Sequence, residues 1–246
     1  MKFHPIFKGK QSEIIMFDKG FKIPMFTKET TFADTSHSSY RRRRRHIYNP
    51  LGFKVPIRIY NKNNQLSIEE VMRRVNDFFY SESPEHFKIP DTSYYFIGEF
   101  DGPIEIDFNM NVINYVEVTF NSEYPYKFYD DEQVLTVQKT AKVNSRTQLP
   151  TTPLIDFSGL SGNNLQLSVS GDKFMRFRMS GNLPANISVD FENEQFYETN
   201  SGVNLTNLVH YDSAFSDFKI DDGDTLVLTN DSDTAKAVLT YKELLL

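Results

Sequence analysis

The sequence contains no cysteine and no tryptophan among its 246 residues. The absence of cysteine excludes disulfide frameworks and thiolate zinc sites, and it removes the residue from which a redox compartment could be inferred. No apolar run approaches the roughly 18 residues that a membrane-spanning helix requires. The N-terminal residues MKFHPIFKGK also lack the apolar segment of a secretory signal. We therefore expect a soluble protein that is made in a cytoplasm and does not enter a membrane.

Signatures of enzymes and of metal sites are also missing. The sequence has no His-Glu-x-x-His motif, no phosphate-binding loop and no nucleophile elbow, and its five histidines lack the spacing of metal ligands. A group of aspartates near the C-terminus does not match a calcium loop, because Gly223 comes too early in it. These residues are Asp221, Asp222, Asp224, Asp231 and Asp233. We predict that the protein is not an enzyme and that it has no metal and no cofactor.

Charge is distributed unevenly, although the net charge is only −6. Residues 1–150 hold 21 Lys and Arg against 19 Asp and Glu, whereas residues 151–246 hold 6 against 14. The overall balance gives no reason to expect nucleic-acid binding. The shift in composition predicts a boundary between two domains near residue 150.

Aromatic residues are abundant, with 22 phenylalanines and 13 tyrosines. This content is typical of packed β-strands and argues against disorder. The pattern of the first half predicts strands around a single helix, as part of an α+β domain dominated by strands. The helix is expected at residues 67–80, since Ser67 and Glu70 form a capping box. An apolar stripe at helical spacing follows it, with Ile68, Val71, Met72, Val75, Phe78 and Phe79.

A polar arm is predicted over Thr27–Tyr60. Thr27–Ser39 is rich in threonine and serine and has no core pattern. Phe53–Tyr60 returns as a strand, and Pro56 within it predicts an edge position, because proline cannot donate to a sheet. Between these parts lies a candidate contact region made of Arg41, Arg42, Arg43, Arg44, Arg45 and Tyr48.

The arginine run admits two interpretations. Such runs can neutralise the phosphates of a nucleic acid. The surrounding region is only weakly basic, however, so we favour a strand that is solvated or that pairs with acidic residues of a neighbouring chain. On an extended strand, alternate arginines would face opposite ways.

The segment Asn114–Tyr129 combines a core strand with a rigid corner. Val116, Val118 and Phe120 alternate with polar residues, which is typical of a strand with one buried face. The alternation stops before Tyr124-Pro125-Tyr126, where proline restricts both its own φ and the residue before it. Phe120, Tyr124, Pro125 and Tyr126 therefore predict a structural joint rather than a catalytic site.

The second half has the pattern of a β-sandwich. Arg146–Pro153 has the composition of a semi-rigid connector. After it come short strands at close spacing, separated by turn signals such as Ser161-Gly162-Asn163 and Asp222-Gly223. We predict one domain over residues 1–148 and a second domain over residues 149–246.

The order of these segments resembles that of the distal tail proteins of long-tailed, non-contractile bacteriophages. That family has an early arm-like hairpin, one helix, strands with a Tyr-Tyr or Tyr-x-Gly segment, and a strand that ends in an aromatic-Pro-Tyr corner. Tyr94–Gly98 and Tyr124–Tyr126 stand in the corresponding places here. The family's closing motif often carries a cysteine and an aspartate before the proline, whereas this chain has Asn121–Tyr124, so the match is to the pattern and not to each residue.

The resemblance implies a mainly β fold. Its N-terminal α+β domain would be a β-sandwich with one helix and the arm-like hairpin, and its C-terminal domain would be a galectin-like β-sandwich. The second half resembles that sandwich in Ile187–Asp190, in the turn Gly202–Asn204 and in Phe218–Leu226.

The function that the resemblance implies is that of a structural hub in a phage tail tip or baseplate. The protein would form a homohexameric ring that joins the tail-tube protein to the tail-associated fibre or lysin protein and carries receptor-binding proteins. Phage DNA would pass through the channel without specific binding, and no membrane would take part. The protein would be made in the cytoplasm of the bacterial host and would be located in the virion.

Two other classes of function stay open at this point. A β-sandwich can bind cell-wall glycans by stacking an aromatic residue on a sugar ring, and Tyr197 and Tyr211 are candidates for such a contact. A glycosidase would need two carboxylates opposed across a cleft. Asp190, Glu192 and Glu194 offer pairs on one strand face, which a solvated face explains more simply.

Overall fold

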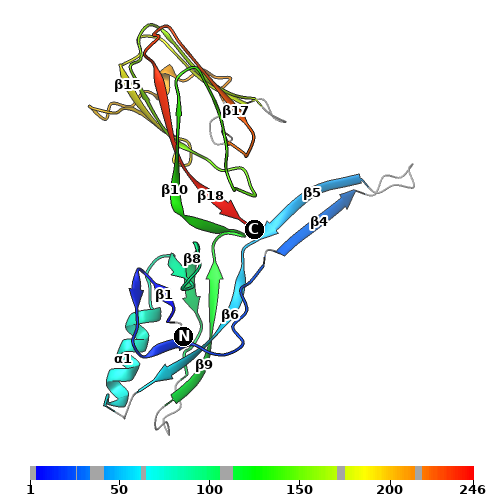
Figure 1. Ribbon diagram of the computed structural model, residues 1–246, viewed down its shortest axis with the longest axis vertical. Coiled ribbons are helices and arrows are strands. Elements are labelled where there is room, and N and C mark those ends of the chain that lie inside the picture. Colours follow the sequence, from blue (N-terminus) through cyan, green and yellow to red (C-terminus); the bar gives the residue numbers. More distant parts are fainter. Residues whose placement is uncertain are drawn as a thin grey trace. The chain divides into compact units, whose positions relative to one another are not determined.

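The computed structural model describes residues 4–25, 27–33, 42–61, 65–105, 113–170, 175–213 and 218–246. It shows a mainly β protein with one α-helix in these residues, as the sequence predicts (Figure 1). The chain divides into two compact units, one formed by residues 1–128 with Leu246 and the other by residues 129–245. Each unit has a hydrophobic core of its own.

The first unit is built on one antiparallel sheet with the strand order β2-β1-β7-β8-β9-β6-β3. Phe17 and Phe87 belong to strands that lie four places apart in this order, yet their ring centroids are 6.1 Å apart. The sheet therefore curls over itself and encloses its core. The strands are β1 (Ile6–Phe7), β2 (Lys10–Gln11), β3 (Ile15–Phe17), β6 (Gly52–Tyr60), β7 (Glu85–Lys88), β8 (Tyr94–Asp101) and β9 (Ile113–Ser122).

The helix α1 (Ile68–Phe79) begins where the capping signal predicts. The Ser67 hydroxyl accepts a hydrogen bond from the Glu70 backbone N–H at 3.2 Å, which satisfies one of the free donors at the helix start. The Glu70 carboxylate does not complete a capping box, because it accepts hydrogen bonds from Arg73 and Arg74 instead. Four of the six stripe residues are buried, whereas Ile68 and Met72 lie at the border of the stripe and are about 40% exposed.

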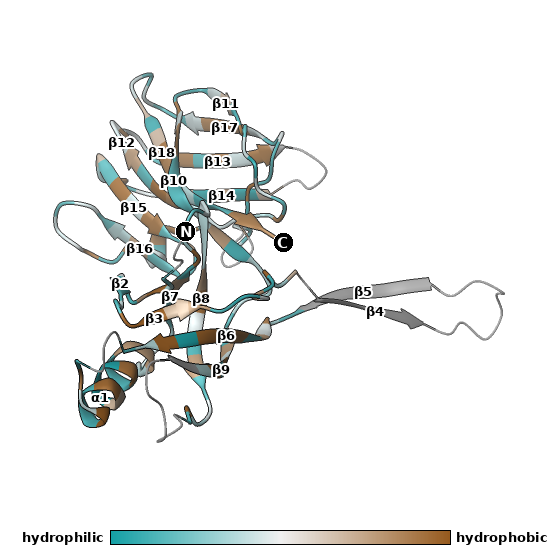
Figure 2. Ribbon diagram, turned by 60° about the horizontal axis from the view of Figure 1, so that its bottom comes forward, coloured by the Kyte–Doolittle hydropathy of each residue, from teal (hydrophilic) through white to brown (hydrophobic). Residues whose placement is uncertain are grey.

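The second unit is a sandwich of two antiparallel sheets (Figure 2). One sheet has the order β16-β15-β12-β18-β10 and the other has the order β11-β17-β13-β14. Alternate residues point into the space between them, as Leu165, Leu167 and Val169 do. The strands are β10 (Lys127–Val137), β11 (Thr140–Lys142), β12 (Leu154–Ser158), β13 (Asn164–Ser170), β14 (Met175–Ser180), β15 (Asn186–Asp190), β16 (Gln195–Glu198), β17 (Thr225–Asn230) and β18 (Lys236–Leu245).

The chain passes from one unit to the other within β10, about twenty residues before the boundary predicted at residue 148. The reason is that the predicted connector is not a linker. The backbone N–H of Gln148 donates to the carbonyl of Leu244 at 2.8 Å, and Thr151 exchanges two backbone hydrogen bonds with Ile220. Residues 129–153 therefore belong to the sandwich.

The connector is also held by a buried carboxylate. Glu243, which is 2% exposed, accepts hydrogen bonds from the Ser145 hydroxyl, from the Arg146 backbone N–H and from the Arg146 guanidinium. Burial raises the pKa of Glu243, but these donors outweigh that effect and hold it below its ordinary value. The Arg146 guanidinium lies 4.4 Å from the centre of the Tyr129 ring.

Candidate assembly surface

The predicted arm is a separate two-stranded hairpin in the first unit. β4 (Thr27–Ala33) and β5 (Arg42–Asn49) pair antiparallel, from Thr27 opposite Asn49 to Ala33 opposite Arg42. In the part of the chain that the structure describes, these two strands pair only with each other (Figure 1). Their backbone groups therefore leave two long sheet edges open to another chain.

The arginine run lies in β5, with an irregular register. Thr31 pairs with Arg45 and Phe32 pairs with Arg43, so Arg44 is an extra residue at a β-bulge. The regular alternation that the sequence predicts for the run is therefore interrupted in the backbone. Tyr48 pairs with Lys28 in the same hairpin, and Arg41 lies outside the described residues.

The arm ends at Asn49 and does not extend to Tyr60. β6 lies within the curled sheet and pairs with β3 on one side and with β9 on the other, and its Val55, Ile57 and Ile59 are fully buried. The prediction of an edge strand from Pro56 is thus wrong. The Pro56 carbonyl accepts from the Asp18 N–H at 2.8 Å just beyond the end of β3. The nitrogen and the carbonyl oxygen of one residue point to the same side of a strand. The nitrogen of Pro56, which has no hydrogen to donate, therefore lies on the side of β6 where pairing with β3 stops.

Phe120 lies at the centre of the first core. Its side chain is fully buried, and its ring centroid is between 4.9 and 6.3 Å from those of four other phenylalanines. These are Phe53, Phe87, Phe96 and Phe100. The residue that closes the core strand is therefore a packing residue, as its position in the alternating pattern indicates.

The Tyr124-Pro125-Tyr126 corner joins β9 to β10 and is half-buried. Both tyrosine rings pack against Phe128, with centroid distances of 5.2 and 5.3 Å, and Phe128 stacks on Tyr95 at 5.6 Å. The Tyr95 ring in turn stacks on His86 at 4.3 Å. These side chains, from His86 to Tyr126, form a continuous aromatic row, which makes the corner rigid.

Two small residues hold the corner against the sheet. The Ser122 hydroxyl lies 3.0 Å from the carbonyl oxygens of both Ile97 and Tyr124. Gly98 lies so close to the neighbouring strand that a Cβ atom there would be 2.1 Å from the Asn121 carbonyl oxygen. Sequence reasoning did not identify this close approach, although a glycine inside a strand pattern is the signal that could have indicated it.

Lys127, the residue after the corner, is a buried cation. It is 2% exposed, and its Nζ donates to the Leu246 carbonyl at 3.2 Å and lies 5.5 Å from the centre of the Tyr94 ring. Burial lowers the pKa of this lysine. The sequence gives no sign that a lysine in this place is buried.

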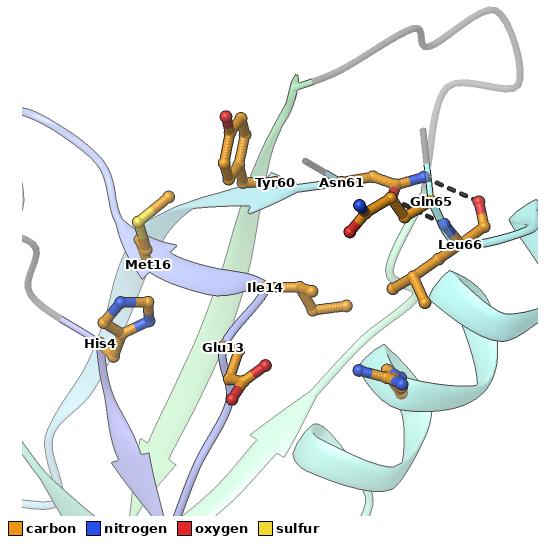
Figure 3. A pocket seen from close by; sticks show the side chains of 9 residues that line it. His4, Glu13, Ile14, Met16, Tyr60, Asn61, Gln65 and Leu66 are labelled. Atoms are coloured by element: carbon orange, nitrogen blue, oxygen red, sulfur yellow. Dashed lines mark hydrogen bonds between the residues drawn. The ribbon is translucent and has the colours of Figure 1, made fainter. Parts of the chain in front are cut away.

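A pocket of about 290 Å³ lies in the first unit (Figure 3). The His4 ring, which lines this pocket, is hydrogen-bonded within the protein, because its Nδ1 lies 2.8 Å from the carbonyl oxygens of both Ser12 and Ile15. Asn61 exchanges two hydrogen bonds with the backbone of Leu66. Glu13, Ile14, Met16, Tyr60, Gln65 and Arg74 complete the lining. This arrangement has no nucleophile paired with a base, so we assign no chemistry to it.

In the described ranges there is no group of three or more His, Cys, Asp or Glu side chains that could hold a metal ion. Four of the five aspartates near the C-terminus accept hydrogen bonds from backbone N–H groups, and Asp233 pairs with Lys139. Asp222 accepts from the Ser145 N–H, Asp224 from the Asp221 N–H and Asp231 from the Asn163 N–H. The described helices include none that is long and apolar enough to span a membrane.

No family model and no curated protein matches this sequence. Solved structures do match it. The crystal structure of the Dit protein of phage SPP1 aligns over 99% of both chains with a TM-score of 0.77 and 12% identity. A chain of the phage P2 baseplate in its activated conformation with strontium aligns over 98% of both chains with a TM-score of 0.50 and 8% identity.

This chain has the distal tail protein fold.

The alignment confirms the mainly β fold class and the resemblance inferred from the order of the segments. The alignment with this fold extends over both units. The hairpin β4–β5, the aromatic corner and the sandwich are therefore all parts of it. The roles of the arm residues Arg41–Arg45 and Tyr48 and of the corner residues stay predictions.

Proposed function

We propose that this protein is the structural hub of a phage tail tip, and that it assembles as a homohexameric ring. The observation that carries the proposal is the match along the whole chain to SPP1 Dit, a protein described as a paradigm of the hub of the adsorption apparatus. A match over 99% of both chains leaves no large part of this chain for a separate enzymatic domain. The protein would thus act through assembly and not through bond chemistry.

The hairpin β4–β5 is the element that would join neighbouring subunits. It offers unpaired strand edges, which favour pairing with another chain. It also brings four consecutive arginines, Arg42–Arg45, in a chain whose net charge is negative, so a neighbouring copy offers acidic partners. A ring requires head-to-tail contacts that close on themselves, and an arm that reaches one neighbour gives a contact of this kind.

The remaining parts of the proposal follow from the same role. The ring would connect the tail-tube protein with the tail-associated fibre or lysin protein, and the acidic sandwich would carry receptor-binding proteins. The virion would be the site of action, and DNA would pass through the ring without base-specific contacts.

Light scattering across a dilution series tests the assembly. We expect a hexamer, or a mixture that shifts toward a hexamer with rising concentration. A protein that stays monomeric over the whole series would contradict a self-assembling ring.

A deletion variant tests the arm. Thr30 and His46 face each other in register, so Thr31–Arg45 can be replaced by Asn-Gly, which forms a two-residue turn between antiparallel strands. We expect a monomer whose circular dichroism still shows folded β-sheet and which still unfolds in a cooperative thermal transition. An oligomer that survives the deletion would contradict the arm's role.

A variant that carries Arg42–Arg45→Gln retains the backbone of the arm and removes its charge. It serves as the matched comparison for the deletion. Loss of the oligomer in both variants would assign the contact to charge, and loss in the deletion alone would assign it to strand pairing.

A further inference from the structure

A cluster of charged side chains lies beside an exposed tyrosine on the second unit. β14 is the end strand of its sheet (Figure 2) and presents Arg176 and Arg178 on its outer face, while Phe177 and Met179 point into the core. The Asp212 carboxylate pairs with both arginines, and the His210 Nδ1 lies 2.5 Å from its other oxygen.

Backbone contacts fix this cluster in place. The His210 N–H donates to the Arg178 carbonyl at 2.8 Å, and the Arg178 N–H donates to the Ser213 hydroxyl at 2.9 Å. Met179 and Val209 form an isolated bridge. The segment from Val209 to Ser213 therefore covers the outer edge of β14 and holds the charged side chains against it.

The charges of the cluster do not balance. Two guanidinium groups face one carboxylate, and in the described part of the chain Asp212 is the only acid that pairs with either arginine. Partial burial raises the pKa of Asp212, but the hydrogen bond from His210 and the two arginines outweigh this effect and lower it. Each guanidinium carries five N–H donors, so donors are left over for an anionic ligand.

Tyr211 gives the cluster a second, independent feature. Its side chain is 88% exposed, and its ring centroid lies 4.4 Å from that of His210. A contact that only covers the edge of β14 has no need of an exposed aromatic ring at this position. Tyr197, the other tyrosine considered from the sequence, is half-buried in β16.

The setting makes the cluster more unusual. Residues 151–246 contain only two arginines, Arg176 and Arg178, in a region where acidic residues outnumber basic ones by 14 to 6. Both arginines meet at this one place. The exposed Tyr211 ring contacts His210, and His210 and both arginines bind the same carboxylate of Asp212. A ring for stacking and guanidinium donors in one cluster match the two chemical parts of an acidic sugar.

We propose that Tyr211, Arg176 and Arg178 form a subsite for an acidic saccharide, in which the tyrosine ring stacks on the sugar and the arginines bind its carboxylate or phosphate. This subsite does not depend on the proposed hub role. It would give the protein a direct contact with a charged glycan, in addition to any contact made through partner proteins.

Ligand-observed NMR titrations on the full chain test the proposal with four probes. Glucuronic acid and glucose 6-phosphate carry both features, glucose carries only the sugar ring, and inorganic phosphate carries only the charge. We expect both acidic sugars to bind more tightly than glucose and more tightly than phosphate, with affinity that falls as salt is added.

Point variants assign the binding to the cluster. Tyr211→Ala removes an almost fully exposed ring and should weaken binding of glucose 6-phosphate about fivefold, as expected for the loss of one aromatic contact. Arg176→Gln should weaken it by a similar factor. Tyr80→Ala and Lys236→Gln alter an exposed tyrosine and an exposed lysine elsewhere and should leave binding unchanged.

Several results would overturn the proposal. Glucose that binds as tightly as glucuronic acid would contradict the acidic class, and phosphate that binds as tightly as glucose 6-phosphate would contradict a saccharide. Absence of binding by all probes, or binding that Tyr211→Ala leaves unchanged, would remove the subsite. None of these results bears on the oligomer, so failure of the subsite and failure of the hub role are separate.

Discussion

Two polar stretches of this chain, the hairpin β4–β5 and the connector Arg146–Pro153, have opposite structural outcomes. Both are rich in threonine and charged or polar residues, and neither has a core pattern. The hairpin pairs only with itself among the described residues, whereas the connector is hydrogen-bonded along much of its length to the sandwich. A polar composition alone therefore does not predict whether a segment pairs only with itself or packs into a folded unit.

The difference lies in the partners that the rest of the chain provides. Glu243 supplies a buried carboxylate for Ser145 and Arg146, and the backbones of β18 and of residue 220 supply acceptors for Gln148 and Thr151. Buried polar groups are tolerated when they are paired. In the described residues the strands of the arm pair only with each other, and we predict that their open edges pair with another chain.

Glu243→Gln should have the largest effect on this comparison. The substitution retains the shape of the side chain and removes the charge that accepts hydrogen bonds from Ser145 and Arg146. Hydrogen bonds to a charged group contribute about 1.5–3 kcal/mol, so we expect the free energy of unfolding to fall by about 2 kcal/mol. Chemical denaturation measures this change, and an unaffected midpoint would show that the carboxylate does not hold the connector.

The same carboxylate predicts a dependence on pH. The pKa of Glu243 is lower in the folded protein than its ordinary value of 4.5. Its contribution is therefore present above the pKa of the unfolded state and is lost as the pH falls through the folded pKa. The difference in unfolding free energy between the wild type and Glu243→Gln should be constant from pH 7 to pH 5 and should shrink below pH 4.5. A difference that grows on acidification would contradict the lowered pKa.

Thr151→Val should have a smaller effect. Thr151 is 5% exposed, and its hydroxyl donates to the Lys242 carbonyl at 2.8 Å. Removal of one neutral hydrogen bond costs about 1 kcal/mol, which thermal or chemical unfolding can detect. Thr229→Val on β17 is the matched control, because Thr229 is exposed and its replacement should change stability by less than about 0.5 kcal/mol.

The smallest change in stability is expected in the arm. The fourfold substitution Arg42–Arg45→Gln should alter the free energy of unfolding of the monomer by less than about 0.5 kcal/mol, as for surface positions. Its measurement requires a concentration at which the chain is monomeric, since association would add to the apparent stability. A loss of more than about 2 kcal/mol would show that the arm contributes to a unit of its own chain, and the contrast with the connector would then disappear.

Much of the local structure follows from short stretches of the amino-acid sequence. The alternation of Val116, Val118 and Phe120 placed Phe120 in the core, and Ser67 marked the start of α1, because these patterns depend on neighbours along the chain. Regular strand patterns with frequent turns also predicted the sandwich of the second half. The order of these elements was sufficient to indicate the distal tail fold.

The conformation of segments whose partners lie far away in the sequence depends on how the whole unit packs. The composition of the connector predicts a linker, whereas in the structure it is bound by Glu243, nearly a hundred residues later in the chain. Pro56 predicts an edge strand, but in the structure it lies in an inner strand at the point where the neighbouring strand β3 ends. Gly98 is needed because β9 approaches its backbone closely, which the sequence does not reveal. Arg176, Arg178 and Asp212 meet through the edge of a sheet, and no local pattern links them. A local pattern records the conformation of neighbouring residues, whereas hydrogen-bond partners across a sheet are set by the packing of the whole unit.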